Sequence, residues 1–191
     1  MEEHKRMGWI EVITGPMFAG KSEELIRRVK RLEYAHKKTL VFKPKMDNRY
    51  AENEIVSHSH LKTKSINIEK AREILPYVTE EIDAVVIDEV QFLDAEIISI
   101  ADQLADQGKR VIVAGLDRDF RGEPFKNIPE LLALAEDITK LTAICVCCGA
   151  PATRTQRIVN GKPAAYDDPI IIVGAAETYE PRCRHCHEIK K

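Results

Sequence analysis

The chain has 191 residues, of which 44% are hydrophobic and 31% are charged, and its formal net charge is −2. This length is sufficient for one domain with a buried core, and the composition argues against a disordered or membrane protein. A protein whose main partner is nucleic acid usually carries an excess of basic residues, so the slightly acidic balance argues against that partner. The sequence has no apolar run of membrane-spanning length and no signal-peptide core, so we expect a cytoplasmic protein.

The amino-terminal part of the chain reads as a strand, a glycine-rich loop and a helix. Residues 9–14 have a strand pattern, and residues 15–22, Gly-Pro-Met-Phe-Ala-Gly-Lys-Ser, fit G-x-x-x-x-G-K-[ST], the loop that wraps the phosphates of a nucleotide. Residues 22–35 have an apolar and a charged face, which predicts an amphipathic helix. We therefore expect the loop backbone and the helix N-terminus to hold phosphates, Lys21 to neutralise their charge and Ser22 to bind Mg²⁺. The loop residues assigned to the ATP site are Gly15, Pro16, Met17, Phe18, Ala19, Gly20, Lys21 and Ser22.

The middle of the chain alternates strand and helix patterns. Strands are expected at residues 39–43, 84–88, 110–115 and 140–145, and helices at residues 69–77, 95–107 and 129–135. Residues 44–64 show no helix or strand pattern strong enough to use and are expected to form a long loop. Apolar strands that alternate with helices predict a parallel sheet covered on both faces.

Two acidic residues follow the apolar strand at residues 84–88. Asp88 stands where nucleotide triphosphatases of this kind place the acid that holds the Mg²⁺ shell. Glu89 is expected to face the attacking group and to accept a proton from water or from a substrate hydroxyl, so this pair alone does not separate a hydrolase from a kinase. The chain contains neither the N-K-x-D tetrapeptide of a GTPase nor the LSGGQ signature of transporter ATPases.

Four of the five cysteines form two C-x-x-C pairs near the carboxyl terminus. Two such pairs supply four thiolates, a ligand set that suits a tetrahedral, structural Zn²⁺ site. Cys147 is left over and is expected to be a packing residue, while His185 and His187 remain alternative ligands. The expected zinc ligands are Cys145, Cys148, Cys183 and Cys186.

The segment between the two cysteine pairs contains Asn160-Gly161, which is a hairpin signal, and an apolar stretch at residues 169–174. A loop that metal fixes at its base is suited to fold over a flat organic ligand. The expected fold is therefore an α/β, P-loop NTPase-like domain over residues 1–144, a parallel sheet flanked by helices, followed by a small zinc-binding subdomain over residues 145–191.

Together these motifs resemble the zinc-containing thymidine kinases of the cytosolic type. The motifs are the phosphate loop, Asp88-Glu-Val-Gln-Phe92, Gly115-Leu-Asp-Arg-Asp-Phe120 with Pro124-Phe125, and the two cysteine pairs with Tyr179 between them. They run in order over essentially the whole chain. The resemblance implies transfer of the γ-phosphoryl group of ATP to the 5′-hydroxyl of thymidine, with Glu89 as the general base and Lys21 as the second catalytic residue.

The resemblance also implies the remaining site residues. Thr155 is placed close to the thymine methyl group, and Gln91 joins Asp88 in the ATP site. Asp47 and Arg49 resemble a mobile loop near the phosphates. The nucleoside site implied in this way comprises Met17, Phe92, Leu116, Phe120, Phe125, Thr155, Tyr179 and four positions of a lasso that binds the base, Ile170, Ile172, Val173 and Gly174.

Members of this family use ATP with Mg²⁺ and a structural Zn²⁺, are commonly homotetramers and are inhibited by thymidine triphosphate, so these properties are implied here as well. Two other functions fit parts of the pattern. One is a P-loop ATPase whose zinc subdomain acts on nucleic acid, against which the acidic balance and the aromatic loop with Phe120 and Phe125 argue. The other is a nucleotide-gated interaction module, against which the placement of Glu89 argues.

Overall fold

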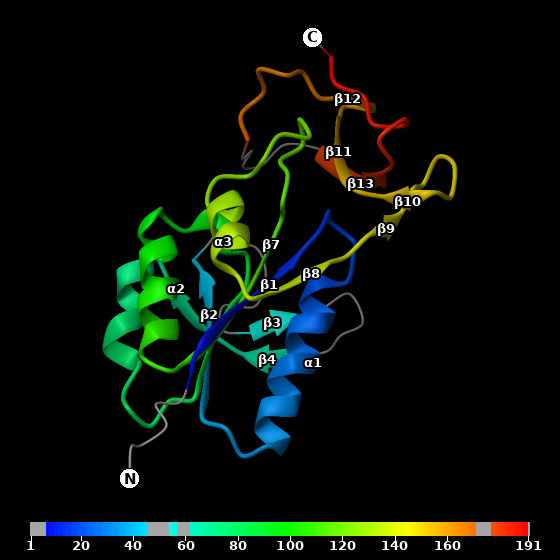
Figure 1. Cartoon of the computed structure of the whole chain (residues 1–191). Helices are drawn as coiled ribbons and strands as arrows, with labels where there is room; N and C mark the ends of the chain where they lie inside the picture. The colour runs from blue at the N-terminus through cyan, green and yellow to red at the C-terminus, as the bar shows by residue number, and fades with distance from the viewer. Residues whose placement is uncertain (1–6, 46–53, 57–61, 171–176, 191) are drawn as a thin grey trace.

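A parallel sheet of six strands forms the centre of the molecule. The computed structural model describes residues 7–45, 54–56, 62–170 and 177–190. The strand order is β5-β2-β6-β7-β1-β8 (Figure 1), and every neighbouring pair is parallel. The predicted parallel α/β sheet is thus confirmed. Its strands are β1 (Trp9–Thr14), β2 (Thr39–Pro44), β5 (Ile66–Ile68), β6 (Ala84–Ile87), β7 (Arg110–Gly115) and β8 (Asp137–Lys140).

Helices cover both faces of this sheet (Figure 1). On one face Ile13 of β1 packs in a buried cluster with Leu25 and Ile26 of α1 (Lys21–Tyr34). On the other face its neighbour Val12 lies in the cluster that contains Ile97 of α2 (Glu96–Asp106). Successive strand residues point to opposite faces, so an apolar strand buries side chains on both. The second face is completed by α3 (Ile128–Leu134) and the 3₁₀ segment η1 (Ala71–Tyr77).

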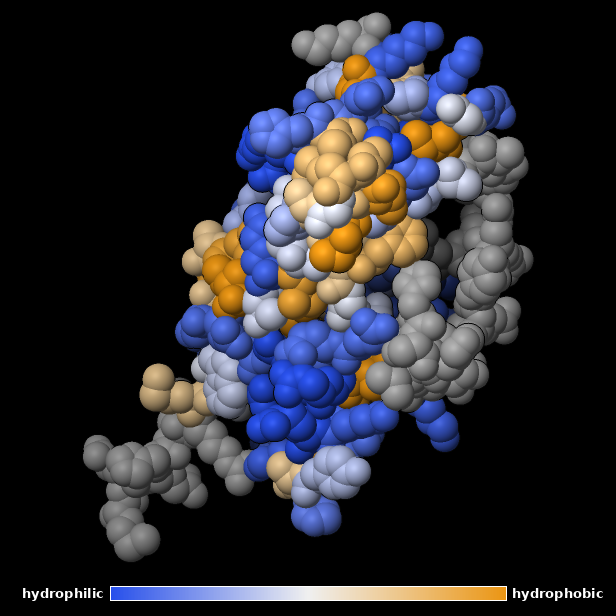
Figure 2. All heavy atoms as spheres, turned by 90° about the vertical axis from the view of Figure 1, so that its right-hand side faces the viewer, coloured by the Kyte–Doolittle hydropathy of each residue, from blue (hydrophilic) through white to orange (hydrophobic). Residues whose placement is uncertain are grey.

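The outer face of α1 is charged, as the amphipathic pattern predicts. Arg27, Lys30 and Arg31 are exposed, whereas Leu25 and Val29 are buried. Figure 2 shows hydrophilic side chains over the lower part of the face on which this helix lies and a hydrophobic area above them. None of the helices in the part of the chain that the structure describes has the length and apolar character needed to cross a membrane.

Two predictions of secondary structure are wrong. The strand expected at residues 140–145 is absent, because β8 already ends at Lys140 and β9 (Ala143–Ile144) pairs with β10 (Pro151–Ala152) outside the main sheet. β8 is a largely exposed edge strand, so it has no apolar run that reveals it in the sequence. The stretch expected to be a loop also contains an antiparallel pair, β3 (Glu54–Val56) with β4 (Lys62–Lys64).

After β8 the chain builds only small antiparallel sheets. β11 (Arg154–Val159) lies between β12 (Lys162–Pro163) and β13 (Glu177–Arg182). Asn160 and Gly161 turn the chain from β11 to β12 with φ angles of 51° and 74°, which confirms the predicted hairpin. In Figure 1 this sheet lies beyond the carboxyl ends of β1 and β7, the edge at which parallel sheets bind ligands. The division of the chain at residue 144 stays a prediction.

Candidate active site

The glycine-rich loop connects the carboxyl end of β1 to α1, as the motif requires. Gly15 has φ 146°, and a Cβ atom there would lie 2.4 Å from the carbonyl oxygen of Leu141, so a side chain does not fit. Gly20 has φ 81° and forms the N-cap of α1. Phe18 is also left-handed, with φ 65°, although it is not glycine and is 44% exposed. The tight loop thus exposes its backbone beside a helix N-terminus, which is the arrangement that binds phosphate.

Lys21 folds back onto this loop. Its Nζ donates a hydrogen bond to the carbonyl oxygen of Pro16 over 2.7 Å. Burial lowers the pKa of Lys21, and the carboxylates of Asp88, Glu89 and Asp117 oppose that shift. A desolvated ammonium group that lies among carboxylates is well placed to neutralise a phosphate.

Asp88 and Glu89 follow β6 at the same edge of the sheet. Asp88 is buried, its Oδ1 accepts a hydrogen bond from the backbone N–H of Glu89 over 2.9 Å, and it also accepts one from the Ser22 hydroxyl. Glu89 is exposed and has φ 49°, a left-handed conformation that is uncommon outside glycine. Such strained backbone is characteristic of functional sites, and here it lies at the N-cap of the 3₁₀ segment η2 (Val90–Phe92).

The environment raises the pKa of both carboxyls. Desolvation raises the pKa of Asp88, against the hydrogen bond from Glu89 and the charges of Lys21 and Lys43. Desolvation and the negative charge of Asp88 raise the pKa of Glu89 to about 7, although solvent reaches its side chain. A carboxyl group with a pKa near neutrality is suited to exchange a proton with a substrate.

Gln91 lies close to these acids in the chain, but its side chain is hydrogen-bonded to another part of the protein. Its side chain is 1% exposed, and its Oε1 accepts a hydrogen bond from the backbone N–H of Leu116 over 3.2 Å. Gly115 leaves room for this amide, since a Cβ atom there would lie 2.6 Å from Gln91 Oε1. This geometry favours a role for Gln91 in holding the start of the loop after β7.

Aromatic residues from two loops meet next to the acidic pair. The rings of Phe92 and Phe125 pack edge to face with their centroids 5.7 Å apart. Phe120 and Phe125 are buried, while Phe92 and Leu116 are half-buried. The loop that carries Phe120 is closed by Asp119, whose Oδ1 accepts hydrogen bonds from the backbone N–H groups of residues 121 and 123. The structure therefore brings these predicted apolar residues to one end of the sheet.

Thr155 connects this region to the phosphate loop. Its side chain is 3% exposed, and its Oγ1 accepts a hydrogen bond from the backbone N–H of Met17 over 3.0 Å. Tyr179 stands on the neighbouring strand β13, opposite Arg157 of β11. No motif in the sequence selects Arg157, yet this residue is 2% exposed and donates from Nε to the Tyr179 hydroxyl over 3.1 Å.

Five of the predicted site residues lie in the ranges that the structure leaves undescribed. Asp47 and Arg49, and Ile172, Val173 and Gly174 of the lasso, fall outside the described residues. Of the lasso only Ile170 is described.

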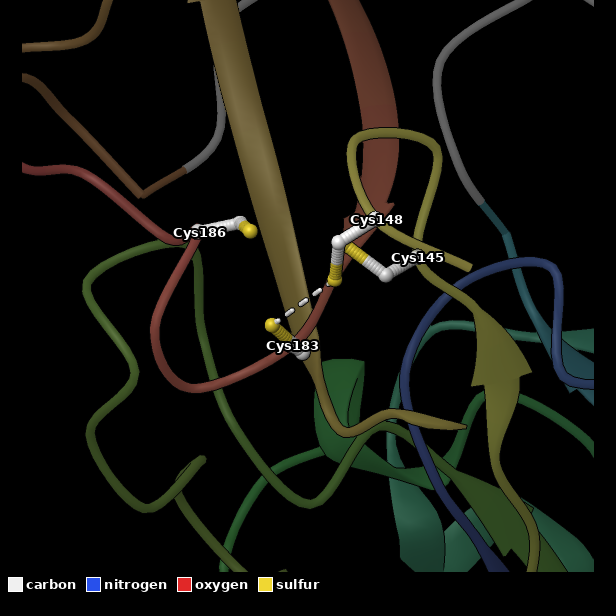
Figure 3. A group of neighbouring side chains, drawn as sticks. All are labelled: Cys145, Cys148, Cys183 and Cys186. Atoms are coloured by element: carbon white, nitrogen blue, oxygen red, sulfur yellow. Dashed lines mark hydrogen bonds between the residues drawn. The ribbon is translucent and has the colours of Figure 1, made fainter. Parts of the chain in front are cut away.

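The four cysteines predicted as metal ligands come together (Figure 3). Their Sγ atoms all lie within 4.8 Å of one another, and those of Cys148 and Cys183 are 3.7 Å apart. A tetrahedral Zn²⁺ with Zn–S bonds of about 2.3 Å requires sulfur atoms about 3.8 Å apart, so the cluster fits this ion. Cys147 lies outside the group and is exposed, so the expectation that it is a packing residue is wrong.

The backbone around the cluster favours thiolates. Gly149 N–H donates to the carbonyl oxygen of Cys145, and Cys145 N–H donates to that of Ala150, which closes a tight knuckle. Burial opposes ionisation of Cys145, but backbone N–H groups directed at its sulfur, those of Cys183, Cys147 and Cys148, lower its pKa to about 6. Metals bind the thiolate form, but hydrogen bonds with neighbouring thiols raise the pKa of Cys148 and Cys186, so the support for a metal site is the close approach of the four sulfur atoms.

The cysteine cluster also contacts the candidate active site. Ala19 of the phosphate loop packs against the buried group that contains Cys145 and Cys183. His187, next to Cys186, has its Nε2 2.8 Å from the carbonyl oxygen of Phe120. The histidine considered as an alternative ligand therefore contacts the aromatic loop, and the cluster supports both the loop and the aromatic wall.

Comparison with known proteins places this arrangement in context. The family model described as thymidine kinase matches residues 8–187. Among solved structures, the crystal structure of domain III from the Thermotoga maritima replication initiation protein DnaA is similar, with a TM-score of 0.42 and 15% sequence identity. That match covers 72% of this chain and 56% of that chain, so this chain spans little more than half the length of that structure. A similarity of this size supports no statement about function.

Proposed function

Because the chain belongs to the thymidine kinase family, we propose that it transfers the γ-phosphoryl group of ATP to the 5′-hydroxyl of thymidine and so forms thymidine monophosphate. Phosphoryl transfer depends mainly on positioning and on neutralising charge, with little covalent chemistry for the protein to perform. The candidate active site has residues for each of these tasks. The proposal therefore assigns roles to the residues that the fold gathers at the carboxyl ends of β1, β6 and β7.

The phosphate loop and Lys21 bind the triphosphate of ATP. Backbone N–H groups of residues 18–22, at the N-terminus of α1, surround the phosphates. The phosphates replace the Pro16 carbonyl, to which Lys21 donates over 2.7 Å, as the partner of the Lys21 ammonium. Lys21 then compensates the charge that develops on the transferring group.

Ser22 and Asp88 are the residues that would hold Mg²⁺. The Ser22 hydroxyl and the Asp88 carboxylate are in hydrogen-bond contact, and both supply the hard oxygen atoms that Mg²⁺ prefers. Asp88 is also desolvated, and desolvation raises its pKa, so a cation beside it would favour its ionised form. Bound Mg²⁺ supplies charge neutralisation on the β- and γ-phosphate oxygens.

Glu89 is the general base. It is the exposed member of the acidic pair, and its charge acts on Lys21, so it lies close to the end of the triphosphate. A carboxylate there accepts the proton of the 5′-hydroxyl as that oxygen attacks phosphorus. The buried Asp88 is held by Ser22 and by the backbone, which leaves Glu89 for this task.

The nucleoside lies between the phosphate loop and the carboxyl-terminal sheet. Met17, Phe92, Leu116, Phe120 and Phe125 provide the apolar walls of the pocket. Thr155 and Tyr179 face the base from β11 and β13, and the lasso covers it with main-chain groups. Recognition by main-chain groups rejects bases with the wrong donors and acceptors, because buried polar groups would be left without partners.

Cys145, Cys148, Cys183 and Cys186 would hold a structural Zn²⁺, which would tie the segments that carry the two cysteine pairs together beside the phosphate loop. We also propose that the protein forms homotetramers, that thymidine triphosphate inhibits it and that it acts in the cytoplasm. These three properties rest on the family alone.

The observation that carries this proposal is the position of Glu89, an exposed carboxylate at the edge of the phosphate site within a chain of this family. It is tested by measuring ATP turnover with Mg²⁺ alone, with thymidine, with 3′-deoxythymidine and with an analogue of thymidine that lacks the 5′-hydroxyl. We expect turnover with the first two nucleosides only. Turnover that is equally fast in all four mixtures would show an ATPase and refute a kinase.

A further inference from the structure

Arg157 occupies an unusual position for a charged residue. It stands on β11 between the aromatic loop and β13, and only 2% of its surface is exposed. A guanidinium group is costly to bury unless its N–H groups find acceptors. Among the described residues, its guanidinium donates to the Tyr179 hydroxyl and to the carbonyl oxygens of Pro169 and Ile170, which belong to the proposed nucleoside site or to the start of the lasso.

Two of these acceptors are main-chain carbonyl groups at the base of the lasso. One terminal nitrogen of Arg157 donates to the carbonyl oxygen of Pro169 over 2.5 Å, and the other donates to the carbonyl oxygen of Ile170. The planar guanidinium thus binds two successive peptide groups at the point where the lasso leaves the described part of the chain. Lysine offers a single ammonium group and does not reproduce this two-pronged contact.

The other contacts of Arg157 are aromatic. Its guanidinium carbon lies 4.0 Å from the ring centroid of Phe120 and 5.5 Å from that of Tyr179. Its Nε donates to the Tyr179 hydroxyl over 3.1 Å. Cations at these distances are attracted to the faces of aromatic rings. One side chain therefore contacts Phe120, Tyr179 and the base of the lasso, three separate parts of the proposed nucleoside site.

We propose that Arg157 is a positioning residue that holds the carbonyl groups of Pro169 and Ile170 against Phe120 and Tyr179 and thereby sets the affinity for the nucleoside. This inference rests on the proposed function. It does not require that Arg157 touch the substrate, because the residue acts through the three groups that it holds.

Arg121 strengthens the same connection from the neighbouring loop. Its guanidinium carbon lies 5.3 Å from the Phe120 ring centroid and 5.0 Å from that of Tyr166, and it donates to the carbonyl oxygen of Asp168 over 3.0 Å. Asp168 is thus hydrogen-bonded to Arg121 of the aromatic loop, and Pro169 is hydrogen-bonded to Arg157 of β11. Arg157 differs in that it also contacts Tyr179 of β13.

The test is the steady-state kinetics of Arg157→Lys, which keeps the charge and loses the two-pronged contact. We expect the KM for thymidine to rise by about tenfold or more while kcat and the KM for ATP change by less than about threefold, because the interaction lost is one of nucleoside binding. The matched control is Arg182→Lys on β13, since Arg182 donates to the Glu180 carboxylate and the Cys186 carbonyl and contacts neither ring. We expect this control to keep the KM for thymidine of the unaltered protein.

Two results would overturn the inference: a KM for thymidine within twofold of the unaltered protein, or KM values for thymidine and ATP that rise by the same factor. The second result would show a general loss of structure. If Arg157→Lys does not fold, Tyr179→Phe removes the hydroxyl that accepts from Arg157 Nε, and an unchanged KM for thymidine in that variant refutes the inference. An unaltered protein that shows no thymidine-dependent turnover refutes the proposed function itself, which keeps the two failures distinct.

Discussion

The backbone N–H of Met17 donates a hydrogen bond to the hydroxyl of Thr155 over 3.0 Å, and this contact joins parts of the chain that are 138 positions apart. Met17 belongs to the variable part of the phosphate loop, and Thr155 to the small sheet beside the cysteine cluster. Next to it Ala19 packs against the group of side chains around Cys145. The loop proposed to bind ATP is therefore held by the part of the chain proposed to bind the nucleoside. We expect a change in one of these parts to alter binding of both substrates.

Thr155→Val tests this connection. Valine keeps the shape of the side chain but leaves the Met17 N–H without its acceptor, and an unsatisfied buried donor costs about 1–3 kcal/mol. We expect the free energy of unfolding to fall by that amount and the KM values for ATP and thymidine both to rise, as measured by urea denaturation and steady-state kinetics. Thr155→Ser keeps the oxygen and is expected to behave like the unaltered protein. A valine variant with unchanged stability and KM values would show that the contact has no energetic role.

Glu89→Gln tests the general base. Glutamine occupies the same space and cannot accept the proton, so we expect kcat to fall by a factor on the order of 10² to 10⁴. Binding of ATP and thymidine, measured by calorimetry, is expected to persist because the walls of the site are unchanged. A kcat close to that of the unaltered protein would remove Glu89 from the mechanism.

Cys183→Ser tests the metal site. Loss of one of four thiolates is expected to lower the zinc content, measured by atomic absorption on purified protein, and to lower the melting temperature. Cys147→Ser is the matched control, because Cys147 is exposed and lies outside the cluster. Equal zinc content in both variants and in the unaltered protein would mean that the cysteine cluster is not the zinc site.

A buried ion-pair network makes a further prediction about stability. Glu11 of β1 is 2% exposed, accepts from Arg110 Nε over 2.5 Å and pairs with Arg28 of α1. Breaking a buried pair costs about 3–5 kcal/mol when a charge is left without its partner. In Glu11→Gln, Arg28 still has its ion pair with Glu24, and the Arg110 side chain is partly exposed to solvent. We therefore expect this variant to lower the free energy of unfolding by about 3 kcal/mol at pH 7. Glu81→Gln is the control, since its pair with Lys38 is exposed, and it should leave the urea midpoint unchanged.

The stability that Glu11 contributes is also expected to depend on pH. Burial raises the pKa of Glu11, but hydrogen bonds from Arg110 and Trp9 and the charges of Arg110 and Arg28 outweigh it, and the pKa lies below its ordinary value of 4.5. The stability that the ionised carboxylate contributes is therefore present above that value and is lost as the pH falls through the folded-state pKa. We expect the difference in unfolding free energy between the unaltered protein and Glu11→Gln to shrink in acid. A difference that stays constant down to pH 2 would contradict this assignment.

Local patterns predicted the central part of the fold. The residues of β7 have the predicted bounds, and the hairpin at Asn160 and Gly161 forms as its sequence indicates. These elements are visible because apolar runs and turn residues act over short distances. The edge strand β8 could not be predicted in the same way, because its exposed residues carry no apolar signal and its pairing with β1 is a contact distant in sequence.

The candidate site also contains residues that could be predicted from the sequence and residues that could not. The phosphate loop, the acidic pair and the four cysteines could be predicted, since each motif has a fixed spacing that its chemistry requires. Arg157 could not, because an arginine in a strand has no distinctive pattern until Phe120, Tyr179 and the lasso are placed around it. Gln91 lies within a motif that predicted a place in the ATP site. In the structure its amide oxygen accepts a hydrogen bond from the backbone N–H of Leu116.

The destination of the γ-phosphoryl group tests the central claim most directly. Purified protein is incubated with Mg²⁺, thymidine and ATP labelled at the γ-phosphorus, and the labelled products are separated and identified. We predict that the label appears on the 5′-oxygen of thymidine in the unaltered protein and is lost from that product in Glu89→Gln. Label that appears only in inorganic phosphate, with or without thymidine, would contradict the account.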